Sequence, residues 1–157
     1  MPSPGSSTAE SAQNVRLQLA DAWLPLIYQR ILKMRTRSYK IGAAAKSVEI
    51  QQTLLGIELK VGRRRLLCPD LATARYLAVF ARAGCPAVAI PYDISRISHL
   101  ADELDSSWHR MLLMADQVSA DRSPAARARL RRWLIAEVRA EISAAGAGSA
   151  TPGLIVS

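Results

Sequence analysis

Apolar residues in the first part of the chain recur at helical spacing. Between residues 13 and 36 they follow one another at intervals of three and four, which predicts an amphipathic helix over 13–36. Pro25 interrupts the pattern, and because its nitrogen carries no hydrogen we expect a kink or a restart there. The end of this helix is basic, with Arg37 and Lys40 near the last carbonyl groups, where cations are favoured.

Two further helices are expected in the second half of the chain. Residues 95–118 carry apolar side chains along one face and polar side chains along the other, which is typical of a helix packed on a core. A last helix is expected over residues 123–143, because Ser123 can cap its first turn and Pro124 suits the first helical position. Core packing is expected for the three tryptophans, which fall on or near apolar faces: Trp23, Trp108 and Trp133.

The middle of the chain alternates with a period of two, which is the pattern of half-buried strands. The alternation is clean over residues 57–61 and approximate over 48–54. Gly56 between them is either a bulge in one long strand or a turn between two strands. Gly62-Arg63 indicates a hairpin turn, and residues 65–68 would form the returning strand.

A helix and a second apolar segment follow this hairpin. Asp70 can cap a helix that runs to about Ala83, and Gly84 suits the left-handed residue after a helix end. Residues 87–90 are apolar without alternation, as in a strand covered on both faces. Strand, helix and strand in this order predict a βαβ unit with parallel strands and a right-handed crossover. The expected fold class is α/β, with a small mixed sheet, made of the hairpin and one βαβ unit, flanked by about four helices.

The ends of the chain differ from its middle in composition. Residues 1–12 and 144–157 are rich in Gly, Ser, Ala and Pro, and we expect the first segment to be disordered and the second to be a flexible tail. Residues 13–143 would form a single α/β domain with an N-terminal helical arm. No signal-peptide pattern and no run of about 18 apolar residues is present, so a cytoplasmic protein without a membrane partner is expected.

The two cysteines, Cys68 and Cys85, are too few for a disulfide framework in a chain of 157 residues. In a βαβ unit they would lie at opposite ends of the sheet, about 15 Å apart for strands of about five residues. A disulfide needs Cα atoms within about 7 Å of each other. We therefore expect both thiols to be reduced and buried.

Charge is uneven along the chain. The sequence holds 21 Lys and Arg against 13 Asp and Glu, a net charge of +8. The excess falls in three basic segments, residues 13–46, 61–92 and 122–145, whereas residues 93–121 are acidic. One interpretation places the acidic helix against a basic neighbour. The other combines the basic segments into a surface for a polyanion.

The second interpretation predicts a nucleic-acid-binding protein whose partner is DNA or RNA. The candidate contacts are arginines of the hairpin turn, residues that follow the first helix, and two arginines of the last helix: Arg63, Arg64, Arg65, Arg37, Tyr39, Lys40, Arg127 and Arg131. The alternative is a protein-interaction or assembly factor, in which helices 13–36 and 123–143 dock on a partner or pair in a homodimer.

One string of residues has the pattern of a catalytic motif. Glu58-Leu59-Lys60 precedes a Gly-Arg-rich turn, and residues 55–92 resemble the PD-(D/E)xK nucleases, especially the small virus-type replication-repair nuclease domains. The resemblance implies that Glu58 would bind a divalent metal ion and that Lys60 would support the attacking water. That family also has an Asp on the preceding strand, whereas residues 42–55 contain one acid, Glu49. Since a single carboxylate holds Mg²⁺ poorly, we expect binding without cleavage, no metal site and no cofactor. A metal-dependent nuclease of this type is the second alternative.

Two pairs on the 95–118 helix have the spacing of metal chelators, His99 with Glu103 and Asp105 with His109. They lie on the polar side of an amphipathic helix, where such residues are expected without a metal ion. We therefore assign neither pair to a metal site.

Overall fold

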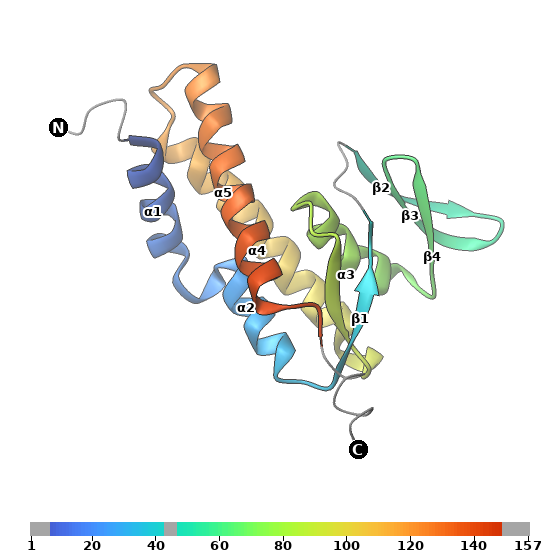
Figure 1. Cartoon of the computed structure of the whole chain (residues 1–157). Helices are drawn as coiled ribbons and strands as arrows, with labels where there is room; N and C mark the ends of the chain where they lie inside the picture. The colour runs from blue at the N-terminus through green and yellow to red at the C-terminus, as the bar shows by residue number, and fades with distance from the viewer. Residues whose placement is uncertain (1–6, 43–46, 149–157) are drawn as a thin grey trace.

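The computed structural model describes residues 7–42 and 47–148, which form a mixed α/β structure (Figure 1). Its elements are, in chain order, α1 (Ser7–Leu19), α2 (Leu24–Leu32), β1 (Thr36–Lys40), β2 (Val48–Thr53), β3 (Gly56–Val61), β4 (Arg64–Cys68), α3 (Leu71–Arg82), β5 (Ala87–Pro91), α4 (Ile97–Val118) and α5 (Pro124–Ala145). Short 3-10 helices at Ala20–Ala22 and Ile94–Arg96 precede α2 and α4. The α/β class predicted from the sequence is confirmed.

Most of the helices and the two sheets lie on opposite sides of the molecule, with α3 between them (Figure 1). α1 packs against both α4 and α5, whereas α3 connects α4 to the three-stranded sheet. One line of apolar residues on α5 faces the core, where four side chains are buried: Leu130, Leu134, Val138 and Ile142. The face of α5 that packs on the core is therefore the face that carries the apolar residues at helical spacing.

The three-stranded sheet is antiparallel, in the order β2-β3-β4. Leu54 and Leu55 form a turn between β2 and β3, so Gly56 ends a turn and is not a bulge. The hairpin turn predicted at Gly62-Arg63 is confirmed between β3 and β4. The face of the sheet that packs on the core buries four side chains: Leu59, Val61, Leu66 and Cys68.

The predicted βαβ unit is wrong. β4 and β5 belong to different sheets, and β5 pairs with β1 in antiparallel orientation. All strand pairs of the described residues are antiparallel, so the sheet is not mixed. Residues 36–40, expected at the basic end of the first helix, form the strand that partners β5.

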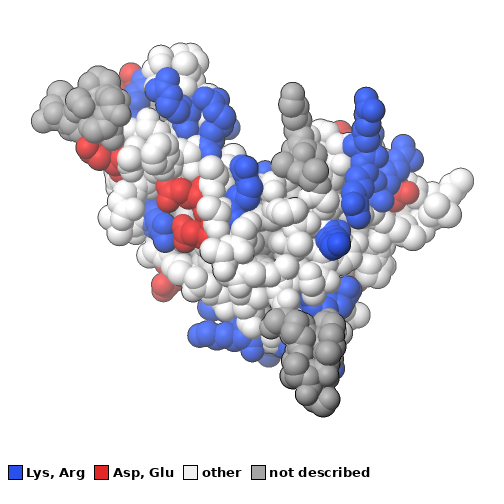
Figure 2. All heavy atoms as spheres, in the orientation of Figure 1, with Lys and Arg blue, Asp and Glu red and all other residues white. Residues whose placement is uncertain are grey.

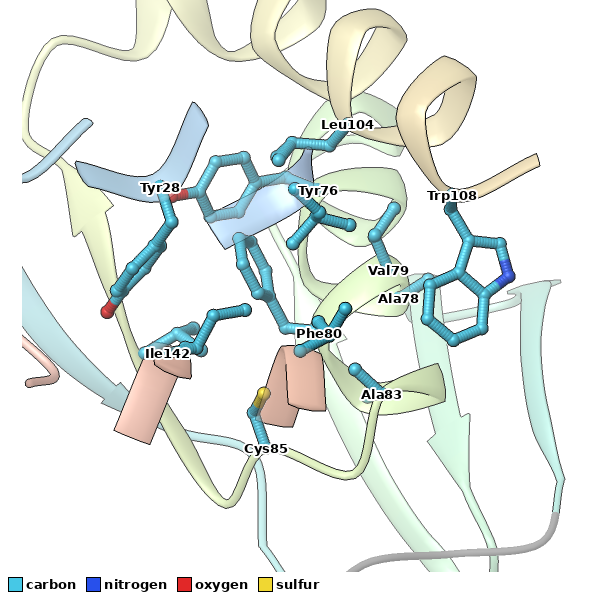
Figure 3. Close-up of a cluster of buried hydrophobic side chains, with 14 of the residues drawn as sticks. Tyr28, Tyr76, Ala78, Val79, Phe80, Ala83, Cys85, Leu104, Trp108 and Ile142 are labelled. Carbon is cyan, nitrogen blue, oxygen red and sulfur yellow. The ribbon is translucent and has the colours of Figure 1, made fainter. Parts of the chain in front are cut away.

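Two tyrosine hydroxyls explain why β5 pairs with only one strand, β1, among the residues that the structure describes. Ala89 donates its N–H to the Tyr28 hydroxyl over 2.8 Å, and its carbonyl accepts from the Tyr76 hydroxyl over 2.7 Å. Tyr28 in turn donates to the carbonyl of Gly146, just beyond α5. Both tyrosine rings contact Phe80, with ring centres 5.4 and 5.2 Å apart (Figure 3). Burial raises the pKa of Tyr28 to about 12, so its hydroxyl keeps its proton.

The other edge of the two-stranded sheet is open within the described residues. Tyr92 donates its N–H to the Arg35 carbonyl over 3.1 Å, so Arg35 and Tyr92 are a hydrogen-bonded pair of the antiparallel β1–β5 ladder. In an antiparallel pair of strands, hydrogen-bonded residue pairs alternate with pairs that are not hydrogen-bonded. The backbone groups of Thr36, Ser38 and Lys40 therefore point away from β5.

The helix predicted over residues 13–36 is two helices. The chain breaks at Ala20–Ala22 and restarts at α2, whose first turn contains Pro25, as the sequence indicated. α1 begins at Ser7, so residues 7–12, expected to be disordered, are helical, and Ala12 is buried. Residues 1–6 and 149–157, which complete the predicted disordered segment and tail, lie outside the described residues.

Both predicted helix caps are confirmed. The Asp70 carboxylate accepts from the Thr73 N–H over 2.7 Å at the start of α3. The Ser123 hydroxyl accepts from the Ala126 N–H over 3.2 Å at the start of α5. After α3, Gly84 has a φ of +82°, the left-handed conformation expected there. Local side-chain chemistry thus fixes these helix ends.

The expectations for cysteine are confirmed, and those for tryptophan only in part. Cys68 and Cys85 are free and buried, although the parallel topology used to argue this is wrong. Trp23 and Trp108 are buried, but Trp133 is 44% exposed because it lies beside the buried line of α5 and not on it. The assignment of Trp133 to the core is therefore corrected.

Removing the Tyr28 hydroxyl should destabilise the fold. Tyr28→Phe leaves the buried Ala89 N–H without an acceptor, and we expect the free energy of unfolding to fall by about 1–3 kcal/mol. Urea denaturation followed by circular dichroism measures this change. Tyr92→Phe, at a ring that is 44% exposed, is the control and should change it by less than about 0.5 kcal/mol. Equal losses in the two variants would contradict the role given to Ala89.

The two thiols should be inaccessible in the native protein. Burial raises the pKa of Cys68, and it raises that of Cys85 to about 11, so neither is a ready nucleophile at neutral pH. We expect an aromatic disulfide reagent to label neither cysteine in buffer and both in denaturant. Fast labelling of the native protein would show that the core opens around one of them.

Candidate nucleic-acid interface

The acidic helix α4 lies against basic neighbours. Its acids pair with arginines of α2, α3 and α5: Glu103 with Arg30, Asp102 and Asp105 with Arg75, Asp105 also with Arg82, and Asp116 with Arg131. Arg16 of α1 pairs in the same way with Glu137 and Glu141 of α5. The first interpretation of the charge pattern is thus confirmed on the helical side, where these arginines bridge one helix to another.

Two of the predicted contact residues belong to this helical side. Arg131 forms a bidentate ion pair with Asp116, in which its Nε and Nη2 donate to the two carboxylate oxygens over 3.0 and 2.6 Å. This ion pair holds the pKa of Asp116 below its usual range. Arg127 lies one turn earlier on α5 and near the same carboxylate. In the view of Figure 2, Lys and Arg side chains stand out both near the start of α5 and over the sheets, and the acidic side chains gather mainly on the helical side. Arg127 and Arg131 therefore belong to the helical side of the molecule, and Arg131 already binds a carboxylate there.

The basic residues of the sheets have no acidic partner within the described part of the chain. No salt bridge there involves the six Lys and Arg of the strands and the hairpin turn: Arg37, Lys40, Lys60, Arg63, Arg64 and Arg65. All six are exposed or half-exposed. Their positive charge is consequently available to a ligand.

Three of the predicted residues come together at Tyr39. The guanidinium carbon of Arg37 lies over the Tyr39 ring, 5.8 Å from its centre. Arg64 approaches from the start of β4 and lies across Gly42, where a Cβ atom would be 3.0 Å from its Cδ. Partial burial raises the pKa of Tyr39, against the opposing effect of Arg37 and Arg64, so the hydroxyl keeps its proton although both cations are near.

The three consecutive arginines of the hairpin do not share one direction. Arg63 lies in the turn, while Arg64 and Arg65 are the first two residues of β4 and therefore face opposite sides of the sheet. Arg65 stands beside Lys60 on the outer face, away from the core. Only Arg64 of the three joins Tyr39.

Arg35 and Tyr92 extend this arrangement, and the sequence analysis missed both. The guanidinium carbon of Arg35 lies over the Tyr92 ring, 4.9 Å from its centre, and Tyr92 is 44% exposed. The signal in the sequence is the period of two in Arg35, Arg37 and Tyr39, which places all three on one face of an extended segment. Lys40 lies on the opposite face of β1.

Glu58 and Lys60 share the outer face of β3, as the nuclease resemblance requires. Glu58 is only 8% exposed, and its Oε1 has no hydrogen-bond partner within the described residues. Glu49 of β2 is in register with Lys60 and accepts from the Gln51 amide over 3.2 Å. Across residues 7–42 and 47–148, no three His, Cys, Asp or Glu side chains are placed to share a metal ion.

The two histidine pairs of α4 are occupied by other contacts. Their acids, Glu103 and Asp105, bind arginines. The Nδ1 of His109 bonds to the backbone carbonyl of Asp105 over 2.8 Å. His99 lines a surface hollow whose two acids, Glu103 and Asp102, already bind arginines.

No family model, curated protein or solved structure matches this chain. The resemblance to nucleases therefore stays a prediction. None of the described helices is long and apolar enough to span a lipid bilayer.

We expect the purified protein not to cleave DNA or RNA in the presence of Mg²⁺ or Mn²⁺. The reason is that Glu58 has no second carboxylate opposite it in the sheet, where its neighbours in register are Gln51 and Leu67. A gel assay with labelled single and double strands tests this. Metal-dependent cleavage that is lost in Glu58→Ala and kept in Glu49→Ala would contradict the expectation and make the nuclease the better assignment.

Proposed function

We propose that the protein binds nucleic acid through a basic surface centred on Tyr39 and takes no part in cleavage. The observation that supports this is the division of charge. The acids of α4 and α5 are paired with arginines, whereas the basic residues of the strands have no acidic partner in the described chain. Arg37 and Arg64 flank a partly exposed aromatic ring on that basic surface.

Free arginines suit phosphates for two physical reasons. A guanidinium group remains charged at all physiological pH values and donates two parallel hydrogen bonds to one phosphate. A guanidinium that is already bound to a carboxylate, such as Arg131, would first have to give up that bond. Each phosphate contact also releases counterions from the nucleic acid, so the affinity should depend steeply on salt concentration.

Removing the two cations beside Tyr39 should weaken binding to all sequences alike. For Arg37→Ala/Arg64→Ala, we expect the plot of log affinity against log salt to become shallower by about 0.7–0.9 for each lost contact. Fluorescence anisotropy with labelled oligonucleotides at several salt concentrations measures both effects. The fold should persist, because exposed charges contribute little to stability.

A matched control removes the same charge from another place. Arg129→Ala/Arg132→Ala takes two exposed arginines from α5, and its affinity and salt slope should stay close to those of the unmodified protein. If both double variants lose affinity equally, net charge drives binding and the surface at Tyr39 is not the site. If no oligonucleotide binds at low salt, the proposed function is wrong.

A separate observation favours an assembly factor as the second candidate. The exposed Trp133 lines a shallow hollow between α1 and α5 together with small residues that include Ala9, Ala136 and Ala140. An aromatic ring beside small side chains can receive a partner helix. Such packing resists moderate salt, whereas phosphate contacts do not. A complex or homodimer that survives moderate salt and is lost in Trp133→Ala, without oligonucleotide binding, would favour this candidate.

A further inference from the structure

We infer that the interface takes single-stranded nucleic acid and stacks its bases on Tyr39 and Tyr92, an inference that rests on the proposed function. Five side chains form what we call the arginine–tyrosine stripe, in the spatial order Tyr92, Arg35, Arg37, Tyr39 and Arg64. Tyr92 and Arg35 lie side by side at one end, Tyr39 and Arg64 lie toward the other, and Arg37 lies between them.

The stripe follows from the register of β1. Arg35, Arg37 and Tyr39 are two residues apart, so they share one face and follow one another at about 6.6 Å along the strand. Tyr92 joins one end, where its N–H bonds to the Arg35 carbonyl and its ring lies under the Arg35 guanidinium. Arg64 joins the other end across Gly42. The Cα atoms of the two tyrosines are consequently about 13 Å apart along the strand direction.

The chemistry of the stripe matches a single strand better than a duplex. A single strand exposes the flat faces of its bases, which stack on tyrosine rings and on guanidinium planes with little regard to sequence. The arginines beside these rings can neutralise the phosphates of the same strand. A duplex hides its base faces within its own stack, so the tyrosines would have nothing to bind there.

Exposure supports this assignment. Tyr92 is 44% exposed and Tyr39 is partly exposed, so each ring keeps surface free although an arginine lies over it. Within the described residues, neither hydroxyl makes a hydrogen bond, in contrast to the hydroxyls of Tyr28 and Tyr76. Tyr92 thus lies at the surface beside Arg35, whereas Tyr39 packs partly against the core and keeps the rest of its ring exposed beside Arg37.

The experiment compares strands that differ only in their bases. Anisotropy is measured with a single strand of about a dozen nucleotides, with an abasic strand of the same length and with the corresponding duplex. We expect the base-bearing strand to bind about 5- to 100-fold more tightly than the abasic strand. Tyr39→Ala and Tyr92→Ala should each reduce the ratio of base-bearing to abasic affinity. Both should leave the affinity for the abasic strand and its salt dependence unchanged, whereas Tyr39→Phe should preserve the ratio. Trp133→Ala, at a ring of the same 44% exposure, is the control and should change nothing.

The outcomes separate the inference from the proposed function. If base-bearing and abasic strands bind alike while Arg37→Ala/Arg64→Ala still weakens both, the inference is wrong and phosphate binding stands. If no probe binds at low salt, the proposed function fails as well. Because Tyr39 is partly buried, its alanine variant is checked by urea denaturation. Should it unfold, the exposed Tyr92→Ala decides, and an unchanged ratio in that variant overturns the inference.

Discussion

The arrangement of the strands depends on the backbone of a single residue, Ala89. Its N–H and carbonyl would pair with another strand in a larger sheet, but they bind the hydroxyls of Tyr28 and Tyr76. These hydroxyls come from α2 and α3, so two helices take the place of a strand along the inner edge of β5. The sheet can then grow only at the opposite edge, where β1 lies, and this brings Arg37 and Tyr39 to the surface.

Charge is distributed in a way that matches this division into helices and strands. The acids of α4 and α5 lie where several helices meet, and each pair with an arginine joins one helix to another. Because those pairs are partly exposed, each adds little to stability, and their main effect on the surface is to cancel charge. The strands have few acids and keep their cations. The excess positive charge, which gives the chain a net charge of +8, therefore lies mainly away from the interfaces between helices.

Features that depend on neighbouring residues could be predicted from the sequence. The caps at Asp70 and Ser123, the hairpin at Gly62 and the restart at Pro25 follow from local chemistry. The partner of β5 could not be predicted, because it is decided by tyrosines 61 and 13 residues away in sequence. β1 was missed because its five residues are mostly polar and follow a helix. Of the candidate site, the sequence identified Arg37, Tyr39 and Arg64 but not their contact, and it omitted Tyr92.

The edge of β1 that has no partner strand within residues 7–42 and 47–148 has a consequence for self-association. An unpaired strand edge is a template for a strand from another molecule, and proteins protect such edges with charged side chains. Arg37 and Lys40 stand on opposite faces of β1 and repel a second copy of the same edge. A polyanion that neutralises these charges removes the repulsion while it occupies the neighbouring surface. The protein should therefore be most prone to aggregate near the ratio of polyanion to protein at which the bound phosphates cancel the positive charge of the protein.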